Sequence, residues 1–248
     1  MKKTALATAL SLCVTAPAMA TGFVNGDFES GNFNGWSQGG GLWYGSPLPP
    51  VSPSIYVGGI PVNQIMSVGT DPITGANTVY SGTYSARANN SINNRSVSTL
   101  YQSVANYTDN NIYFAWNAVL EASHGLTDSD YFSLTLRDDT TSTDIVSRAY
   151  SSAGSIGSGT SGVKWTPHGN WFSSGWVVEN INLQTLGAVG HDFTLTLLAS
   201  DCPYSGHAGY VYLDGFGAVP PQVPEPTSLA LMSLGLAGLG AIRRRKAA

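Results

Sequence analysis

Short apolar runs bounded by turn-forming residues are the feature that most limits how this chain can fold. Between residues 21 and 219 no apolar periodicity of helical length occurs, and clusters of Gly, Asn, Asp and Ser separate the runs. Runs with strand character cover residues 111–120, 131–136, 144–150, 176–183, 193–199 and 210–216. Many short strands joined by Gly-rich turns predict an all-β antiparallel sandwich, and roughly 200 residues can bury one core. Residues 37–81 read as a long loop with Gly39-Gly40-Gly41 and several prolines.

The amino terminus has the pattern of a secretory signal peptide. Lys2 and Lys3 precede an apolar stretch over residues 5–14, and Ala18 and Ala20 form an A-x-A cleavage site. The apolar stretch is too short to span a bilayer. We therefore expect residues 1–20 to be removed and residues 21–219 to form one exported domain.

Residues 220–248 form a second terminal segment. Pro224-Glu225-Pro226 lies in a proline-rich stretch that cannot continue a helix or strand. The next 16 residues carry no charge and would make about 24 Å of helix, which is short against a hydrocarbon core of about 30 Å. Arg243, Arg244 and Arg245 with Lys246 would hold the tail on the cytoplasmic side. The pattern predicts a single short transmembrane helix.

This tail resembles the PEP-CTERM sorting signal of exported proteins in Gram-negative bacteria that make exopolysaccharide. The resemblance implies processing at the Pro-Glu-Pro motif by exosortase, a membrane transpeptidase, after a transient stay in the inner membrane. It further implies a final location on the cell surface or in the biofilm matrix. An ordinary tail anchor is the alternative, but it would not need Pro224, Glu225 and Pro226.

The exported domain resembles galactose-binding-like jelly rolls, including family 4 and related carbohydrate-binding modules. The resemblance lies in four blocks, at residues 25–36, 81–87, 100–104 and 209–216. It implies a structural Ca²⁺ held by the Asp27 backbone carbonyl and the carboxylates of Glu29 and Asp214. Alternatively, Glu29 and Asp214 make hydrogen bonds in turns or caps.

Aromatic residues are the main indication of ligand binding, because a flat ring can stack on the C–H face of a sugar. Trp43 and Tyr44 lie in the long loop, and Trp165, Trp171 and Trp176 follow a Gly/Ser-rich stretch. We take these five as candidate carbohydrate-binding residues. Trp36 and Trp116 lie in apolar patterns that predict the core, and burial is an alternative for the other rings as well.

Charge and motifs restrict the remaining functions. Five basic and 14 acidic residues give residues 21–222 a formal charge of −9, which argues against nucleic-acid binding. Glu29, Glu121 and Glu179 are the glutamates of the domain, and no glycosidase motif surrounds them. Cys202 and His207 likewise lack a protease motif, and burial is expected for this lone mature cysteine. The acidic run at residues 128–130 reads as a solvated turn. We expect a non-enzymatic protein that contacts extracellular polysaccharide; a structural or adhesive matrix protein is the alternative, and a polysaccharide hydrolase ranks last.

Overall fold

The computed structural model of the chain describes residues 22–44, 53–56, 58–125, 128–153 and 162–217. Both terminal segments, with their predicted cleavage site, helix and Arg-rich end, lie outside these ranges. The elements are β1 (Ser37–Leu42), η1 (Pro53–Tyr56), β2 (Gln64–Ser67), β3 (Tyr84–Ala88), β4 (Ser96–Val104), β5 (Asn111–Glu121), β6 (Tyr131–Asp138), β7 (Thr143–Ser151), β8 (Thr166–His168), β9 (Trp171–Ser173), β10 (Val177–Asn182), α1 (Leu183–Leu186), β11 (Phe193–Ser200) and β12 (Gly209–Gly217). No helix within the described ranges is long and apolar enough to cross a membrane.

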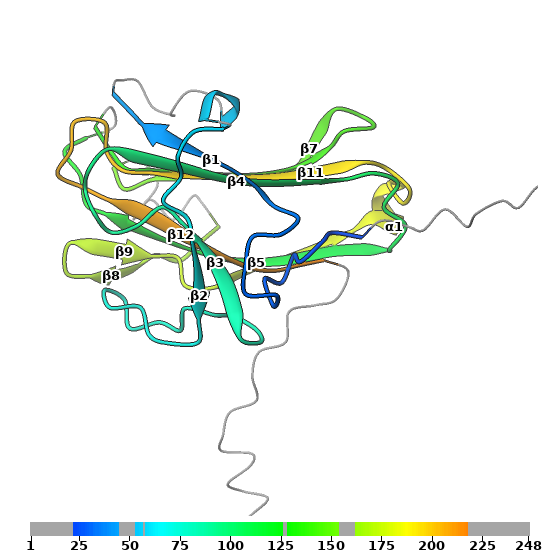
Figure 1. The fold of residues 1–248 in the computed structure, drawn as a ribbon, viewed down its shortest axis with the longest axis horizontal. Coiled ribbons are helices and arrows are strands. Elements are labelled where there is room, and N and C mark those ends of the chain that lie inside the picture. The colour runs from blue at the N-terminus through cyan, green and yellow to red at the C-terminus, as the bar shows by residue number, and fades with distance from the viewer. Residues whose placement is uncertain (1–21, 45–52, 57, 126–127, 154–161, 218–248) are drawn as a thin grey trace, which may run out of the picture.

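Two antiparallel sheets face each other, as the all-β prediction requires (Figure 1). The five-stranded sheet has the order β1-β4-β11-β6-β7. The second sheet has the order β2-β3-β12-β5-β9-β8, and β10 pairs with β5 beside β9. The chain therefore forms the expected jelly-roll sandwich.

Strict alternation builds the core between the sheets. On β11, Phe193, Leu195 and Leu197 point inward and are fully buried, while Thr194 and Thr196 face outward. On β5, Phe114, Trp116, Ala118 and Leu120 belong to the same main core, so the prediction that Trp116 is a core residue is confirmed. Trp36 is also buried there, and its indole N–H donates to the Asn25 carbonyl.

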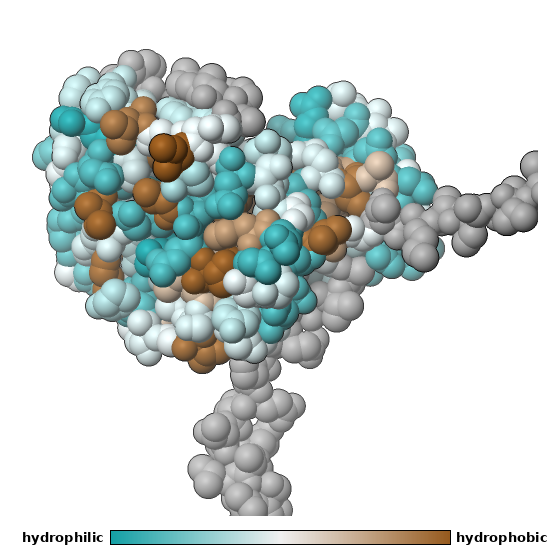
Figure 2. Space-filling model, viewed as in Figure 1, coloured by the Kyte–Doolittle hydropathy of each residue, from teal (hydrophilic) through white to brown (hydrophobic). Residues whose placement is uncertain are grey.

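All six predicted strand regions are confirmed, with ends within two residues of those expected. The loop predicted over residues 37–81 is wrong in part, because β1, η1 and β2 lie within it. Residues 68–81 lie between β2 and β3 in the chain and run across the outer face of the second sheet (Figure 1). We call these residues the covering segment. On the face seen in Figure 2, apolar residues form small patches separated by hydrophilic ones.

Candidate functional site

A row of five aromatic rings lies on the outer face of the second sheet, under and beside the covering segment. The rings follow each other with centroid separations of 6.0 Å from Trp171 to Tyr210, 5.7 Å to Tyr212, 6.1 Å to Trp176 and 5.5 Å to Tyr80. Tyr210 and Tyr212 are buried, whereas Trp171, Trp176 and Tyr80 keep part of their surface exposed. We call these five residues the aromatic row.

Strand geometry explains how distant residues meet here. Tyr210 and Tyr212 are two positions apart on β12, so both side chains leave the same face. β12 and β9 pair with opposite edges of β5, which brings Trp171 to the same face. After β9 the backbone of Ser174 bonds to Ala118, and the left-handed Gly175 turns the chain, so that Trp176 arrives beside Tyr212.

Asp71 in the covering segment fixes the two buried tyrosines. Its Oδ2 accepts from the hydroxyls of Tyr210 at 2.7 Å and Tyr212 at 2.6 Å, and its Oδ1 accepts from Ile73 and Thr74. Burial raises the pKa of Asp71, but the hydrogen bonds to the ionised carboxylate outweigh burial and leave the pKa below its ordinary value. Burial and the neighbouring Asp71 raise the pKa of both tyrosines, so their hydroxyls remain donors.

Polar side chains cross the aromatic row at Tyr212. The strand register places Gln64, Arg87, Tyr212 and Asn117 side by side on four neighbouring strands. Arg87 donates from Nη2 to Gln64 at 2.9 Å and lies over the Tyr210 ring, with 5.6 Å from Cζ to the ring centroid. Arg87 Nε and Asn117 Nδ2 are buried and have no acceptor among the described residues. Such donors are normally paired, so these two are exceptions beneath the outer face of the sheet.

The five candidate sugar-binding residues fall in three places, and only Trp171 and Trp176 come together. Trp43 is 5% exposed and packs with Tyr56, so its ring is unavailable for stacking and this part of the prediction is corrected. Trp165 packs against Tyr150 at the main core, with a centroid separation of 5.4 Å. Tyr44 is 67% exposed and lies at one end of the sandwich.

Sequence reasoning missed most of the row and its polar neighbours. Tyr210 and Tyr212 were assigned only to a strand, although their spacing already places both rings on one face. Asp71, Tyr80, Arg87 and Asn117 carry no sequence pattern that links them to this face, since they meet only through strand pairing and the covering segment.

The expected calcium residues do approach one another. Glu29 Oε1 accepts from the backbone N–H groups of Thr83 and Tyr84 at 2.8 and 2.9 Å, and Asp214 Oδ2 accepts from those of Tyr80 and Ser81. Asp214 Oδ1 is buried without a partner among the described residues. Burial, with a contribution from the charge of Glu29, raises the pKa of Asp214 to about 7.

This arrangement fits a hard cation in part. Two carboxylates each have one oxygen bonded to backbone N–H groups, and an unpaired buried oxygen is the group that a cation would stabilise. The side chain of Asp27 is exposed and accepts from the Glu29 N–H group. Within the described residues, no three His, Cys, Asp or Glu side chains form a metal-binding group. Backbone carbonyls would therefore have to supply most of the ligands.

Two further predictions concern the burial of Cys202 and the turn at residues 128–130. Cys202 is buried, as predicted, and its Sγ donates to Asp128 at 2.9 Å. The expectation of a solvated turn at residues 128–130 is wrong for Ser129 and Asp130, which are fully buried. The Asp130 carboxylate bonds to the Glu121 N–H group, and it therefore belongs to the internal packing of this loop.

Comparison with solved structures finds β-sandwich domains of low similarity. TmCBM61 in complex with β-1,4-galactotriose is 11% identical, with a TM-score of 0.40 over 79% of this chain and 97% of its own. CBM27-1 of Caldicellulosiruptor saccharolyticus, in complex with mannohexaose, is 11% identical with a TM-score of 0.38 over 82% and 98%. The K3 adhesin domain of Lys-gingipain from Porphyromonas gingivalis is 11% identical with a TM-score of 0.35 over 81% and 99%. No curated protein matches the chain.

The carboxyl-terminal tail matches a family model. Residues 222–246 match the PEP-CTERM protein-sorting motif, as the Pro-Glu-Pro segment and Arg-rich end indicated. The chain thus carries a PEP-CTERM sorting motif, which implies that the protein is exported.

Proposed function

We propose that this exported protein binds a carbohydrate chain along the aromatic row and holds it at the cell surface or in the biofilm matrix. The observation that supports the proposal is the row itself, in which the partly exposed rings of Trp171, Trp176 and Tyr80 lie beside polar groups on one sheet face. Exposed ring faces suit the C–H face of a pyranose, and nearby donors suit its hydroxyls. Arg87 and the exposed Gln64 are the polar groups nearest the row.

Binding is favoured over hydrolysis by the positions of the glutamates. A glycosidase needs two carboxyl groups facing one cleft. Glu179 pairs with Arg148 and accepts from the Trp116 indole, while Glu121 accepts from Ala208. Glu29 accepts from backbone N–H groups on the loop before β3. A structural or adhesive matrix protein without a sugar site is the second candidate.

Paired tryptophan variants test the site. Trp176→Ala removes a ring of the row, and we expect it to weaken binding to any glycan found by panel screening about tenfold or more. Trp165→Ala is the matched control, because Trp165 is also partly buried but packs on Tyr150, away from the row. Thermal melting establishes that both variants fold. Equal affinities for the two variants, or no binding to any neutral glycan or to the host exopolysaccharide, would favour the matrix candidate.

We also propose that Ca²⁺ is held by the carboxylates of Glu29 and Asp214 with the Asp27 carbonyl. The ion would supply a link between the opening segment, the loop before β3 and β12. We expect a chelator to lower the melting temperature of the wild type and to leave Asp214→Ala unchanged. A wild-type melting curve that is the same with and without chelator contradicts the calcium site.

For the tail, we propose that exosortase cleaves near Pro224-Glu225-Pro226 after transient insertion in the inner membrane. Mass spectrometry of the surface-exposed protein should then find a chain that ends close to this motif. Recovery of mature protein that still contains Arg245 is the contrary result.

A further inference from the structure

Two exposed tyrosines contact one arginine at the end of the five-stranded sheet where β1 and β11 finish and β4 begins. Tyr44 is 67% exposed and Tyr204 is 56% exposed, and they are the described aromatic residues with more than half of their surface in solvent. Arg95 contacts both. Its Cζ lies 5.4 Å from the centroid of the Tyr44 ring, and its Nη2 donates to the Tyr204 carbonyl at 3.3 Å.

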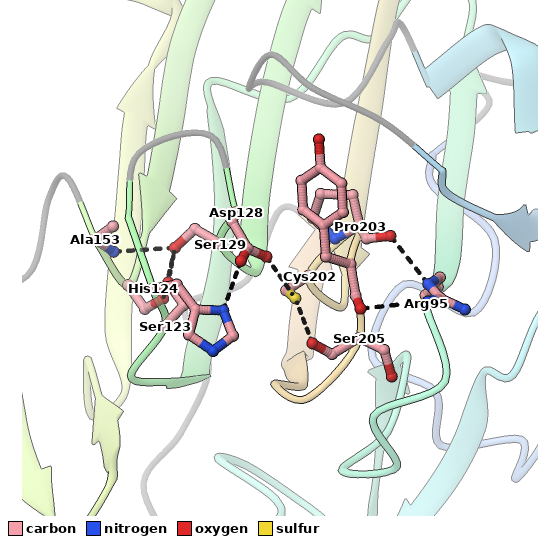
Figure 3. A network of polar contacts seen from close by, with 11 residues as sticks. Arg95, Ser123, His124, Asp128, Ser129, Ala153, Cys202, Pro203 and Ser205 are labelled. Atoms are coloured by element: carbon pink, nitrogen blue, oxygen red, sulfur yellow. Dashed lines mark hydrogen bonds and ion pairs between the residues drawn. The ribbon is translucent and has the colours of Figure 1, made fainter.

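The loops beneath these residues fix the position of the guanidinium. Arg95 Nε donates to the Pro203 carbonyl at 3.0 Å (Figure 3). The Arg95 carbonyl accepts from the backbone N–H group of Trp43, whose side chain is buried. On either side of Arg95, the N–H groups of Asn94 and Ser96 donate to the buried Asp201 carboxylate. The turn at residues 203–204 therefore holds the guanidinium, while Trp43 and Asp201 hold the backbone at residues 94–96.

The turn that carries Tyr204 is fixed as well. Cys202 accepts from the Ser205 N–H group and donates its own N–H to His207, which closes the turn. Ser205 Oγ donates to the Asn93 carbonyl at 3.0 Å and joins this turn to the loop that carries Arg95. Arg95 and Ser205 have left-handed backbone angles, φ +66° and +74°, which non-glycine residues rarely adopt. Such strained positions are concentrated at binding sites.

Arg95, like Arg87 and Lys164, forms no ion pair with the described residues. Arg137 and Arg148 form ion pairs with Asp139 and Glu179. Arg95 bonds only to carbonyl oxygens, and among the described residues no carboxylate lies within ion-pair distance of it. These two bonds occupy two of the five guanidinium N–H groups and leave three for a ligand.

Nearby acidic groups are already engaged elsewhere. Asp128 accepts from Cys202 and contacts His124 (Figure 3). The His124 ring is in contact with the ring of His207. Asp201 is directed at backbone N–H groups and Asn89. The half-buried guanidinium of Arg95, which lies over the Tyr44 ring, thus remains available to an anionic ligand.

We propose that Tyr44, Arg95 and Tyr204 form a second binding site, which takes a carboxylate-bearing sugar such as a uronic acid unit of an acidic polysaccharide. The planar carboxylate matches the guanidinium fork and forms charge-assisted hydrogen bonds with it. A tyrosine ring can stack on the C–H face of the same sugar. Because residues 21–222 are acidic overall, binding of such a polymer requires a local positive charge, which Arg95 supplies at this site.

A matched pair of ligands tests the proposal on the purified full chain. Oligogalacturonate and its methyl ester share the sugar and differ in the carboxylate charge. We expect the acid to bind at least about tenfold more tightly than the ester by calorimetry. Arg95→Gln should abolish this preference, whereas Arg137→Gln, which removes a paired arginine, should preserve it. Alginate oligosaccharides serve as a second uronate probe.

Two further variants keep the test independent of folding and of the aromatic row. Tyr204→Ala leaves the Arg95 contacts to backbone carbonyls in place and should weaken uronate binding with an unchanged melting temperature. Trp176→Ala should not affect uronate binding. Equal affinity for acid and ester, an unaltered preference in Arg95→Gln, or failure of both uronates to bind overturns the second site. Loss of uronate binding in Trp176→Ala would assign that binding to the aromatic row instead.

Discussion

The buried carboxylate of Asp214 makes the stability of this protein depend on pH in a way that one substitution should remove. Asp214 is fully buried, and its pKa is raised from an ordinary value of 3.8 to about 7. Ionised Asp214 therefore destabilises the calcium-free fold. This penalty is absent below the unfolded-state pKa, increases as the pH rises above about 4, and is complete above about pH 7.

The size of the effect follows from the shift. A shift of about three pKa units corresponds to about 4 kcal/mol, at about 1.4 kcal/mol per unit. Asp214→Asn removes the charge and keeps an oxygen to accept from Tyr80 and Ser81. The amide N–H groups of the new Asn side chain replace an oxygen that is buried without a partner among the described residues. Because these donors have no acceptor, they destabilise the folded variant by about 1–3 kcal/mol at every pH. The pH-dependent part of the difference between the two proteins should still be about 4 kcal/mol.

Urea unfolding in the presence of a chelator, from pH 4 to pH 8, measures this difference. We expect the stability of Asp214→Asn relative to the wild type to increase by about 4 kcal/mol over that range. Asp130 and Asp201, whose pKa values burial also raises, are present in both proteins and cancel in the comparison. A stability difference that stays constant with pH would refute the assignment. Excess calcium should reverse the order at pH 8 if the proposed ion binds.

Three further results are expected. Asp71→Ala leaves the hydroxyls of Tyr210 and Tyr212 without their acceptor and should cost about 2–5 kcal/mol in urea unfolding at pH 7. Because the pKa of Asp71 is lowered, its contribution is present above about pH 4 and should be lost on acidification; a variant cost that is unchanged at pH 2 contradicts this. Leu134→Ala should cost about 2–5 kcal/mol, because the side chain is fully buried in the main core; a midpoint equal to that of the wild type would be the contrary result. Burial raises the pKa of the Cys202 thiol to about 12, so iodoacetamide should modify it slowly at pH 8 until urea unfolds the protein; fast modification of the native state contradicts this.

The strands that could be predicted have either alternating side chains, as in β11, or a continuous apolar run, as in β5. β11 reads as apolar and Thr residues in turn, and its inner face is the buried one. β1 gave no such pattern because Gly39, Gly40 and Gly41 have no side chains to alternate. Its glycines are nevertheless required, since a Cβ on Gly39 would lie 2.1 Å from the Tyr56 carbonyl oxygen and one on Gly40 would lie 2.5 Å from Pro61. Close backbone approach is a tertiary property, and the sequence alone presented this strand as a loop.

The sequence could predict only those members of the candidate site whose residue type and local sequence indicate sugar binding. The residue types at Trp171 and Trp176 indicated sugar stacking, but the same reasoning selected Trp43, which the packing of β1 and η1 buries. The local sequence shows where aromatic residues occur. The pairing of strands that are far apart in the chain decides which of their rings remain exposed.

The sequence by itself determined the sorting tail and the all-β class, because each depends on composition or on a pattern along a single segment. Only the tertiary structure decided that Asp71 binds Tyr210 and Tyr212, that Arg95 lies between Tyr44 and Tyr204, and that Asp214 is buried near Glu29. The members of each group are 141 to 185 residues apart at their extremes. Their contacts arise when two sheets pack and loops from both close over the ends, which no single segment encodes.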